Sequence, residues 1–158
     1  MIENFNDNFR EICLNLKIDK RKFILGLSGG IDSMALLSLL KSFIVSNKSL
    51  KIEVFPVIID HDLRSNSSNE AKAVQDIALS LGFNAIIKKI IIKKPSGNIQ
   101  NWARKERRRI LCDIAFEFSA NLILGHHSDD LVETIPLRPS IPEPLADLIN
   151  IVSTKSSA

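Results

Sequence analysis

Apolar and polar residues alternate along this chain in blocks that predict a regular succession of strands and helices. Four short, nearly continuous apolar runs predict β-strands at residues 23–27, 52–59, 85–92 and 122–124. In other stretches apolar residues recur every three or four positions, which predicts helices at residues 4–16, 34–40, 71–81 and 99–118. The third helix is expected to start near Ser67 or Ser68, with Gly82 just after its end.

This order predicts the fold class. Strands that are apolar on both sides and alternate with helices are typical of a parallel sheet covered on both faces, so we expect an α/β, doubly wound, Rossmann-like domain. Ligands of such sheets bind beyond the carboxyl ends of the strands. Three polar segments follow strands, at residues 28–33, 60–70 and 125–134. We therefore expect them to meet at one rim.

The pattern changes after Thr134. Four of the six prolines stand at positions 136, 139, 142 and 144, and proline disfavours helix both at its own position and at the one before it. We expect residues 1–134 to form one domain and residues 135–158 to form a loosely ordered tail, in which 145–152 could form a short helix.

Composition narrows the function classes. The 158 residues are 45% hydrophobic and 25% charged, as in a globular domain, and the net charge of +3 is only weak evidence for an RNA partner. No run is long enough for a signal peptide or a membrane span, so we expect a cytoplasmic protein without a membrane partner. Cys13 and Cys112 lack metal-binding spacing and are predicted to be buried thiols. The oligomeric state is not indicated.

The segment Ser28–Ser33, SGGIDS, is a glycine-rich turn from strand to helix. Gly29 and Gly30 allow close approach of a ligand, while the two serine hydroxyls and the unpaired amides of the first helical turn point at the same volume, so Ser28, Gly29, Gly30, Ile31, Asp32 and Ser33 are the candidate nucleotide-binding residues. This arrangement predicts a phosphate site. Asp32 would repel a bare phosphate, so it favours a Mg²⁺-nucleotide. The simpler alternative is a tight turn with a helix-start carboxylate.

The other two rim segments also carry candidate residues. His61 and Arg64 follow the second strand and face either a nucleotide, an anionic substrate or solvent. In GHHSDDLVET, either Asp129 or Asp130 shares a helix face with Glu133, which is unfavourable unless a cation joins them. We expect a functional role for these carboxylates and for His126 and His127. Zinc binding is the alternative, although the HExxH spacing is absent.

A run of charged residues at 104–109 lies on the fourth predicted helix. We expect Lys105 and Arg108 on its solvated face. Arg104 and Arg107 are three positions apart, share one edge and could reach a phosphate together. RNA binding, ATP binding and plain solubility remain open for them.

Together these motifs resemble the tRNA(Ile)-lysidine synthetase family of the PP-loop ATP pyrophosphatase superfamily, over residues 23–134. The matching residues are Ser28–Ser33, His61, Leu63, Arg64, Gly97, Asn98, Ala103, Arg104, Arg107, Leu111, Gly125, His126, His127, Asp129, Asp130, Glu133 and Thr134. The chain departs from the family pattern at three positions, where Asp62 replaces glycine, Arg108 tyrosine and Leu131 glutamine. The continuation after Thr134 and the tRNA-binding C-terminal domains of the family also have no counterpart here.

The resemblance implies a PP-loop domain that uses ATP and Mg²⁺, with tRNA(Ile) and free lysine as partners. The C2 oxygen of the wobble cytidine would be adenylated, and lysine would then displace AMP to give lysidine. The implied catalytic residues are Asp32 as the Mg²⁺ ligand, Arg107 and Asp130. The implied substrate or supporting residues are His61, Arg64, Arg104, His126, His127, Asp129 and Glu133.

Two other functions remain open. One is another PP-loop synthetase, such as an NAD synthetase-like amidotransferase, which shares SGGIDS but is disfavoured by GHHSDD and the paired arginines. The other is a nucleotide-binding domain without catalysis, as in a truncated or decayed copy, which the proline-rich tail and Asp62 favour.

Overall fold

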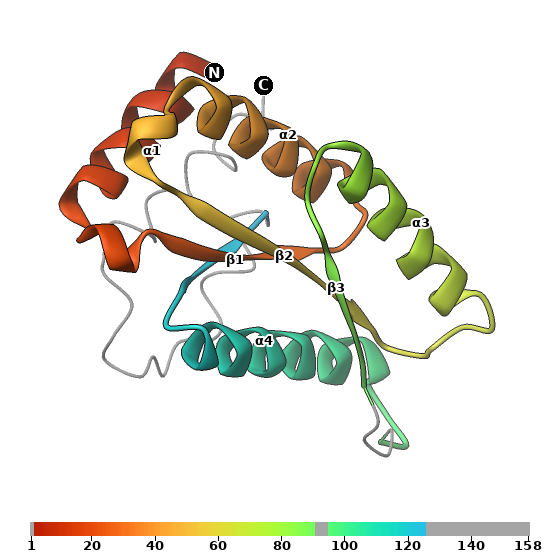
Figure 1. Cartoon of the computed structure of the whole chain (residues 1–158). Helices are drawn as coiled ribbons and strands as arrows, with labels where there is room; N and C mark the ends of the chain where they lie inside the picture. The colour runs from red at the N-terminus through yellow and green to blue at the C-terminus, as the bar shows by residue number, and fades with distance from the viewer. Residues whose placement is uncertain (1, 91–94, 126–158) are drawn as a thin grey trace.

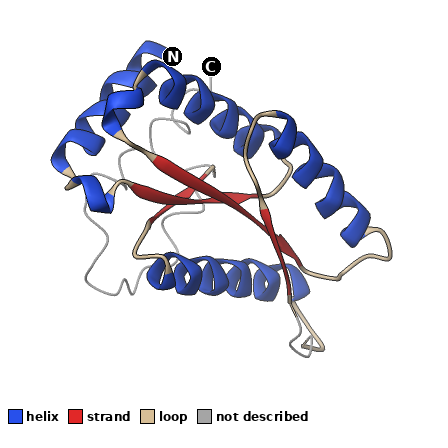
Figure 2. Cartoon of the chain, viewed as in Figure 1, coloured by secondary structure: helices blue, strands red, loops and turns tan. Residues whose placement is uncertain are grey.

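The computed structural model describes residues 2–90 and 95–125 of the chain, and these form alternating strands and helices (Figures 1 and 2). The elements are α1 (Ile2–Asn15), β1 (Lys22–Leu27), α2 (Ile31–Ser46), β2 (Glu53–Asp60), α3 (Ser67–Ser80), β3 (Ile86–Lys89), α4 (Ile99–Glu117) and β4 (Asn121–Leu124). Short 3-10 turns at Ile18–Lys20 and Lys48–Leu50 precede β1 and β2.

The described strands form one parallel sheet in the order β3-β2-β1-β4. From β1 the chain moves outward through α2 to β2 and through α3 to β3. It then returns through α4, on the opposite face of the sheet, to β4 on the other side of β1 (Figure 1). The doubly wound α/β fold is thus confirmed. The strand order reverses between β1 and β4, and the carboxyl ends of strands at such a reversal are where ligands bind.

Each face of the sheet has its own hydrophobic core. Helices α1, α2 and α3 cover one face, where Phe5, Phe9, Phe23 and Phe43 pack ring against ring beneath them. Helix α4 covers the other face, and its Leu111 packs there with apolar residues of β1, β2 and β4. Burial on both faces explains why the strands read as continuous apolar runs.

The boundaries differ from expectation at β3, which ends at Lys89. The exposed Lys88 and Lys89 mark the edge of the sheet, yet the Ile90 amide still donates to the Asp60 carbonyl (2.9 Å), so pairing persists one residue further. Gly82 follows the end of α3 with φ +87°, as predicted for a glycine after a helix. The predicted tail and the GHHSDD helix lie outside the described residues.

The two cysteines behave differently. Cys13 is buried in the α1–α2 core, as predicted, but Cys112 is exposed, so that prediction is wrong. The reason is helical phase: Leu111 and Ala115 of α4 face the sheet, and the next residue after Leu111 is turned by about 100°. Within the described ranges, no helix has the length and apolar character needed to cross a membrane.

Candidate functional site

The SGGIDS turn joins β1 to α2 and depends on Gly29. Its φ of +79° is in the left-handed region, and a Cβ atom here would lie 2.6 Å from Val74 Cγ2 on α3. Gly30 caps α2 with φ −70°, which any residue can adopt. The turn therefore requires glycine at position 29 both for its conformation and for its contact with α3.

The two serines of the turn hold its shape. The Ser33 hydroxyl is buried, donates to the Gly30 carbonyl (3.0 Å) and accepts from the Ser28 amide (3.2 Å). Ser28 Oγ lies 3.0 Å from Ser33 Oγ and accepts from the Gly30 amide at 3.3 Å. The expectation that both hydroxyls point at a ligand is therefore not met by Ser33, which points into the turn.

The start of α2 supplies the groups suited to an anion. The Met34 amide makes the first intrahelical hydrogen bond, to the Gly30 carbonyl, so the amides of Ile31, Asp32 and Ser33 have no acceptor within the helix. Ile31 is 89% exposed, and Asp32 is half-buried beside it. These amides lie at the positive end of a 16-residue helix and favour phosphate.

The carboxyl end of β4 lies directly against this turn. A Cβ atom at Gly125 would be 3.0 Å from the Ser33 Cα and 3.1 Å from its amide nitrogen. Gly125 is the first residue of the GHHSDD motif, so the motif begins beside the turn. His126, His127, Asp129, Asp130 and Glu133 lie outside the described residues.

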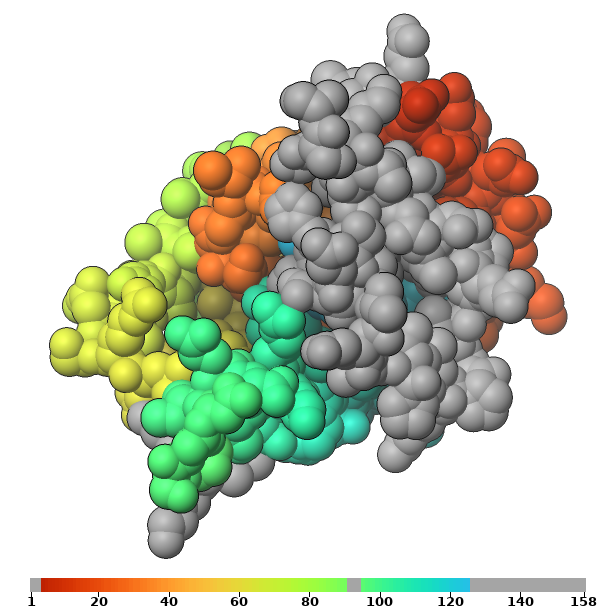
Figure 3. Space-filling view, turned by 180° about the vertical axis from the view of Figure 1, so that it is seen from behind, coloured from red at the N-terminus to blue at the C-terminus, as the bar shows by residue number. Residues whose placement is uncertain are grey.

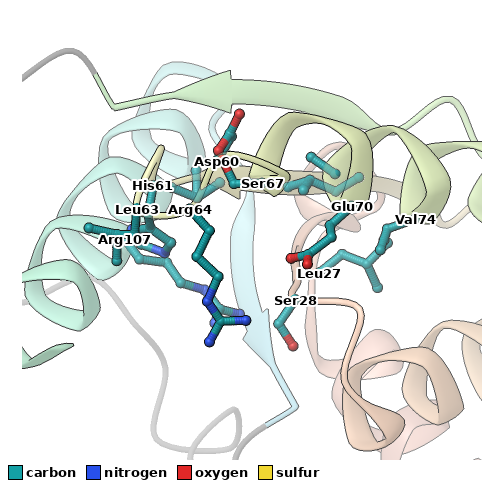
Figure 4. Close-up of a pocket in the computed structure, with 13 residues that line it drawn as sticks. Leu27, Ser28, Asp60, His61, Leu63, Arg64, Ser67, Glu70, Val74 and Arg107 are labelled. Atoms are coloured by element: carbon teal, nitrogen blue, oxygen red, sulfur yellow. The ribbon is translucent and has the colours of Figure 1, made fainter.

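A pocket of about 280 Å³ connects the turn with the carboxyl end of β2, the first half of α3 and Arg107 in the middle of α4. Its lining includes Ser28, His61, Arg64 and Arg107, so the fold brings these predicted residues together. Arg64 and Glu70 point toward the part of the pocket beside Ser28, and Arg107 lies beside His61 (Figure 4). From behind, the start of α2, the β2–α3 loop and the start of α4 border the same face (Figure 3).

His61 and Arg107 influence each other electrostatically. Burial and then the neighbouring charge of Arg107 lower the pKa of His61, with Asp60 acting in the opposite direction. Burial and then Arg104 lower the pKa of Arg107. His61 Nδ1 and Arg107 Nη2 are both buried, and neither has a hydrogen-bond partner among the described residues. The imidazole is thus favoured in its neutral form beside a charged guanidinium.

Asp60 is an organising residue that the sequence interpretation missed. Its buried carboxylate accepts from the Asp62 amide (2.9 Å) and the Ser68 hydroxyl (2.8 Å), tying the loop that carries His61 and Arg64 to α3. Burial raises the pKa of Asp60, but the hydroxyls of Ser67 and Ser68, the Asp62 amide and Lys89 outweigh it, so the pKa is lowered. The sequence did contain a signal for this role, because Asp60 is a charged residue directly after the apolar run of the second strand.

Asp62 occupies the position where the family has glycine, and its φ is +50°. Aspartate tolerates this left-handed conformation better than most residues. Its carboxylate also forms an ion pair with Lys89 (3.3 Å) on the neighbouring strand β3. The departure from glycine is therefore accommodated.

The charged run on α4 divides by face. Lys105 is exposed as predicted, whereas Arg108 is half-buried, so the prediction of a solvated Arg108 is wrong. Arg104 is exposed and does not line the pocket, although its charge acts on Arg107. Arg109 pairs with Glu106 (2.9 Å) and Asp113 (3.0 Å) on its own helix.

A resident metal cluster is not evident in the described part of the chain, where no three His, Cys, Asp or Glu side chains gather. A single carboxylate such as that of Asp32 is compatible with Mg²⁺, because this ion commonly binds through one or two carboxylates together with substrate phosphates and water.

Comparison with known proteins identifies relatives of this sequence. The PP-loop domain family matches residues 1–158. The chain is 39% identical over 118 residues to the tRNA(Ile)-lysidine synthase of Orientia tsutsugamushi, covering 74% of the chain and 26% of the relative. It is 40% identical over 123 residues to the tRNA(Ile)-lysidine synthase of Streptococcus sanguinis, covering 76% of the chain and 27% of that relative. For the Thermosipho africanus synthase the values are 32% over 143 residues, covering 87% and 32%.

The chain thus spans about a quarter to a third of the length of these curated relatives. Among solved structures, it is similar to the U34-tRNA thiolase NcsA from Methanococcus maripaludis with its [4Fe-4S] cluster, with a TM-score of 0.62. The match covers 82% of this chain and 46% of the thiolase at 20% identity, which supports the fold alone.

Proposed function

The chain belongs to the PP-loop domain family, and from this membership we propose that it binds Mg²⁺-ATP and serves the formation of lysidine in tRNA(Ile). The observation that carries the proposal is the SGGIDS turn at the reversal of strand order, with Ser28 opening onto the His61–Arg107 pocket. Similarity to tRNA(Ile)-lysidine synthases supports the choice of tRNA as substrate.

The proposed reaction has two steps. The C2 oxygen of the wobble cytidine attacks the α-phosphorus of ATP and pyrophosphate leaves. The amine of lysine then attacks C2, loses a proton, and AMP leaves with the C2 oxygen. The amides at the start of α2 would stabilise the charge on the leaving pyrophosphate, as preorganised donors do. Bound Mg²⁺ would neutralise phosphate charge, and Asp32 is the residue that would hold it.

Other residues are assigned to the second reactant. Arg107, positioned on α4 beside His61, would contact the activated base or an anionic group. Asp130 would orient the metal or the lysine ammonium, with Asp129, Glu133, His126 and His127 in support. Arg104 would add positive charge at the approach to Arg107.

Binding of ATP to the 158-residue chain, measured by titration calorimetry with and without Mg²⁺, tests the first part. We expect Asp32→Ala to weaken binding with Mg²⁺ by about tenfold and to change Mg²⁺-free binding less. Asp19→Ala, which alters an exposed carboxylate before β1, is the matched control and should have no effect. An equal loss under both conditions would leave Asp32 only a role at the helix start.

A second candidate function is nucleotide binding without catalysis. It rests on the SGGIDS turn and its hydrogen bonds alone, which need no second reactant. Incubation with tRNA(Ile), ATP and lysine, followed by mass spectrometry of the RNA nucleosides, separates the two functions. Lysidine supports the enzyme, and ATP binding without lysidine supports the binding domain.

A further inference from the structure

The loop between β2 and α3 brings His61 and Arg64 to the pocket, yet burial does little to hold it. Residues 62–66 are all exposed, and segments with few buried apolar contacts open at low cost in free energy. A charge contact reaches this loop from the sheet. The Asp62 carboxylate forms an ion pair with Lys89 of β3 (3.3 Å). The loop is therefore tied to the edge of the sheet at one residue.

Lys89 reaches the loop because of the sheet register. Asp60 and Lys89 are partners in the parallel pairing of β2 with β3, and the Ile90 amide donates to the Asp60 carbonyl (2.9 Å). Side chains of register partners project from the same side of a sheet, so the charge of Lys89 acts on the Asp60 carboxylate. In Figure 4 this carboxylate points toward the pale green strand β3 and away from Arg64. It also accepts the Asp62 amide (2.9 Å), so one lysine serves two linked aspartates.

The backbone at Asp62 makes this contact a particular feature of the chain. Its φ of +50° lies in the left-handed region that favours glycine, the residue that the family has at this position. A side chain in this region is retained where its surroundings stabilise it. Glycine would have no carboxylate to offer. The aspartate thus adds an ion pair between loop and strand at a position that would be easier for glycine to occupy.

The pair of Asp62 and Lys89 differs from ion pairs on the helices of this chain. Lys72 pairs with Asp76 within α3, and Arg109 pairs with two carboxylates of its own helix α4. Such pairs reinforce local helical structure. The pair of Asp62 and Lys89 instead joins segments that are far apart in the sequence, so it fixes the position of the loop relative to the sheet.

We propose that Asp62 and Lys89 form an ionic latch that fastens the β2–α3 loop to β3 and so positions His61 and Arg64 at the pocket. The side chains of Lys89 and Asp62 are 51% and 49% exposed, so dissolved salt screens the pair and the latch opens readily. The loop is closed at low ionic strength and looser at high ionic strength. The latch does not depend on the proposed function, whereas its effect on ATP binding does.

Trypsin cleavage after Arg64 reports opening of the latch, because a protease needs a locally released segment and Arg64 is exposed in the loop. Peptide mass spectrometry measures the rate of this cleavage relative to cleavage after Lys17, an exposed residue before β1. We expect Asp62→Asn and Lys89→Gln each to raise the relative rate about twofold at low ionic strength. In about 1 M salt the unchanged chain should approach the rate of these variants.

Matched variants separate the ion pair from other effects of substitution. Lys88→Gln, at the neighbouring exposed position of β3, is the control and should leave the rate unchanged. Lys89→Arg keeps the charge and should keep the slow rate. Asp62→Gly fits a φ of +50° but lacks the carboxylate, so cleavage should be at least as fast as in Asp62→Asn. The double variant Asp62→Asn with Lys89→Gln should be no faster than Lys89→Gln alone, because both changes remove the same pair.

The imidazole of His61 reports whether the latch positions the pocket residues. Burial and then Arg107 of α4 lower the pKa of His61 in the closed loop, while Asp60 of β2 acts in the opposite direction. An open loop moves the ring toward water, so Asp62→Asn should raise the pKa of His61 toward 6.5. NMR titration measures this pKa, with the ring signals assigned by their absence in His61→Gln. An unchanged pKa despite faster cleavage would overturn the positioning role.

ATP titration keeps the latch apart from the proposed function. If both hold, Asp62→Asn should weaken ATP binding by about twofold, because a smaller closed population is available to bind. Absence of ATP binding by the unchanged chain would contradict the proposed function alone, since cleavage and the His61 titration need no nucleotide. Equal cleavage rates in the unchanged chain, Asp62→Asn and Lys89→Gln would overturn the latch, as would equal acceleration by Lys88→Gln.

Discussion

Gly29 and Gly30 are neighbours in the sequence but have different roles in the fold. Gly29 has φ +79° and its Cα faces Val74, whereas Gly30 has φ −70° and a Cβ there would lie 3.4 Å from Ser28 Oγ. We expect Gly29→Ala to reduce ATP affinity by about tenfold or more, because the turn must shift to relieve both strains. Gly30→Ala should change the affinity little. Calorimetric titration with ATP compares the pair, and equal effects would contradict the assigned difference.

Cysteine reactivity provides a second test. Burial raises the pKa of Cys13 to about 12, with Arg21 acting in the opposite direction, so the thiol stays protonated and enclosed. Cys112 is exposed on α4. We expect iodoacetamide to alkylate Cys112 rapidly in the native chain and Cys13 only after unfolding, because the thiolate is the reactive form. Peptide mass spectrometry measures the two rates, and comparable native rates would contradict the buried position of Cys13.

His61 predicts a dependence of stability on pH. Its pKa in the folded chain lies below the ordinary value of 6.5 because of burial and Arg107, so the unfolded chain binds the proton more readily. The stability contributed by the neutral imidazole is complete above the ordinary pKa of 6.5 and is lost as the pH falls from there through the lower pKa of the folded chain. We expect His61→Gln to lose less stability than the unchanged chain between about pH 7.5 and about pH 5.5. Urea unfolding at both values measures the difference, and identical losses would contradict the assignment.

Single residues also show where sequence interpretation succeeds and fails. His61, Arg64 and Arg107 could be selected because charged or titratable residues stand out near apolar strands and within an amphipathic helix. Ser33 could not be recognised as a structural residue, since only coordinates reveal that its hydroxyl points to Gly30. The role of Asp60 likewise depends on Ser68, eight residues later, folding back to it.

Hydrophobic periodicity identified every strand and the principal helices of the described chain, because burial on one or both sides leaves a strong pattern. The pattern did not determine how deeply residues outside the apolar stripe of a helix are buried. Cys112 was therefore expected to be buried although it is exposed, and Arg108 is half-buried although it was expected on the solvated face. The hydrophobic pattern also gave no information on strand order. In the structure β4 lies beside β1 and not beside β3, which precedes it in the chain.

Helix α4 contacts the centre of the sheet through Leu111. This side chain is fully buried, and its Cδ1 lies only 2.8 Å from where a Cβ at Gly26 would be, so α4 approaches β1 closely. We expect Leu111→Ala to lower the free energy of unfolding by about 2–5 kcal/mol, as large-to-small core substitutions do. Lys105→Ala, on the exposed side of the same helix, should change it by less than about 0.5 kcal/mol. Urea denaturation compares them, and a loss within the control range would contradict this packing.

At the level of the whole molecule, the candidate functional residues lie at one edge of the sheet, where the carboxyl ends of its strands meet. The SGGIDS turn, the β2–α3 loop and Gly125 all follow carboxyl ends of parallel strands, so segments nearly a hundred residues apart meet at one rim. Helices α1, α2 and α3 stabilise one face and α4 the other, which leaves this rim to the polar residues. The resulting rim joins the SGGIDS turn to the pocket lined by Arg64 and Arg107.

Nucleotide binding and lysidine formation should therefore separate in this polypeptide. The turn and its supporting contacts lie within the described residues, whereas 68–74% of the length of the compared synthases has no counterpart in the match. We expect the 158-residue chain to bind Mg²⁺-ATP but to form no detectable lysidine with tRNA(Ile) and lysine, and to bind RNA weakly and with strong salt dependence, since its net charge is only +3. A chimera in which a relative's longer continuation replaces residues 135–158 should recover lysidine formation, measured by mass spectrometry. Robust lysidine formation by the unchanged chain would instead mean that the rim from Ser28 to Thr134 is sufficient for both recognition and chemistry.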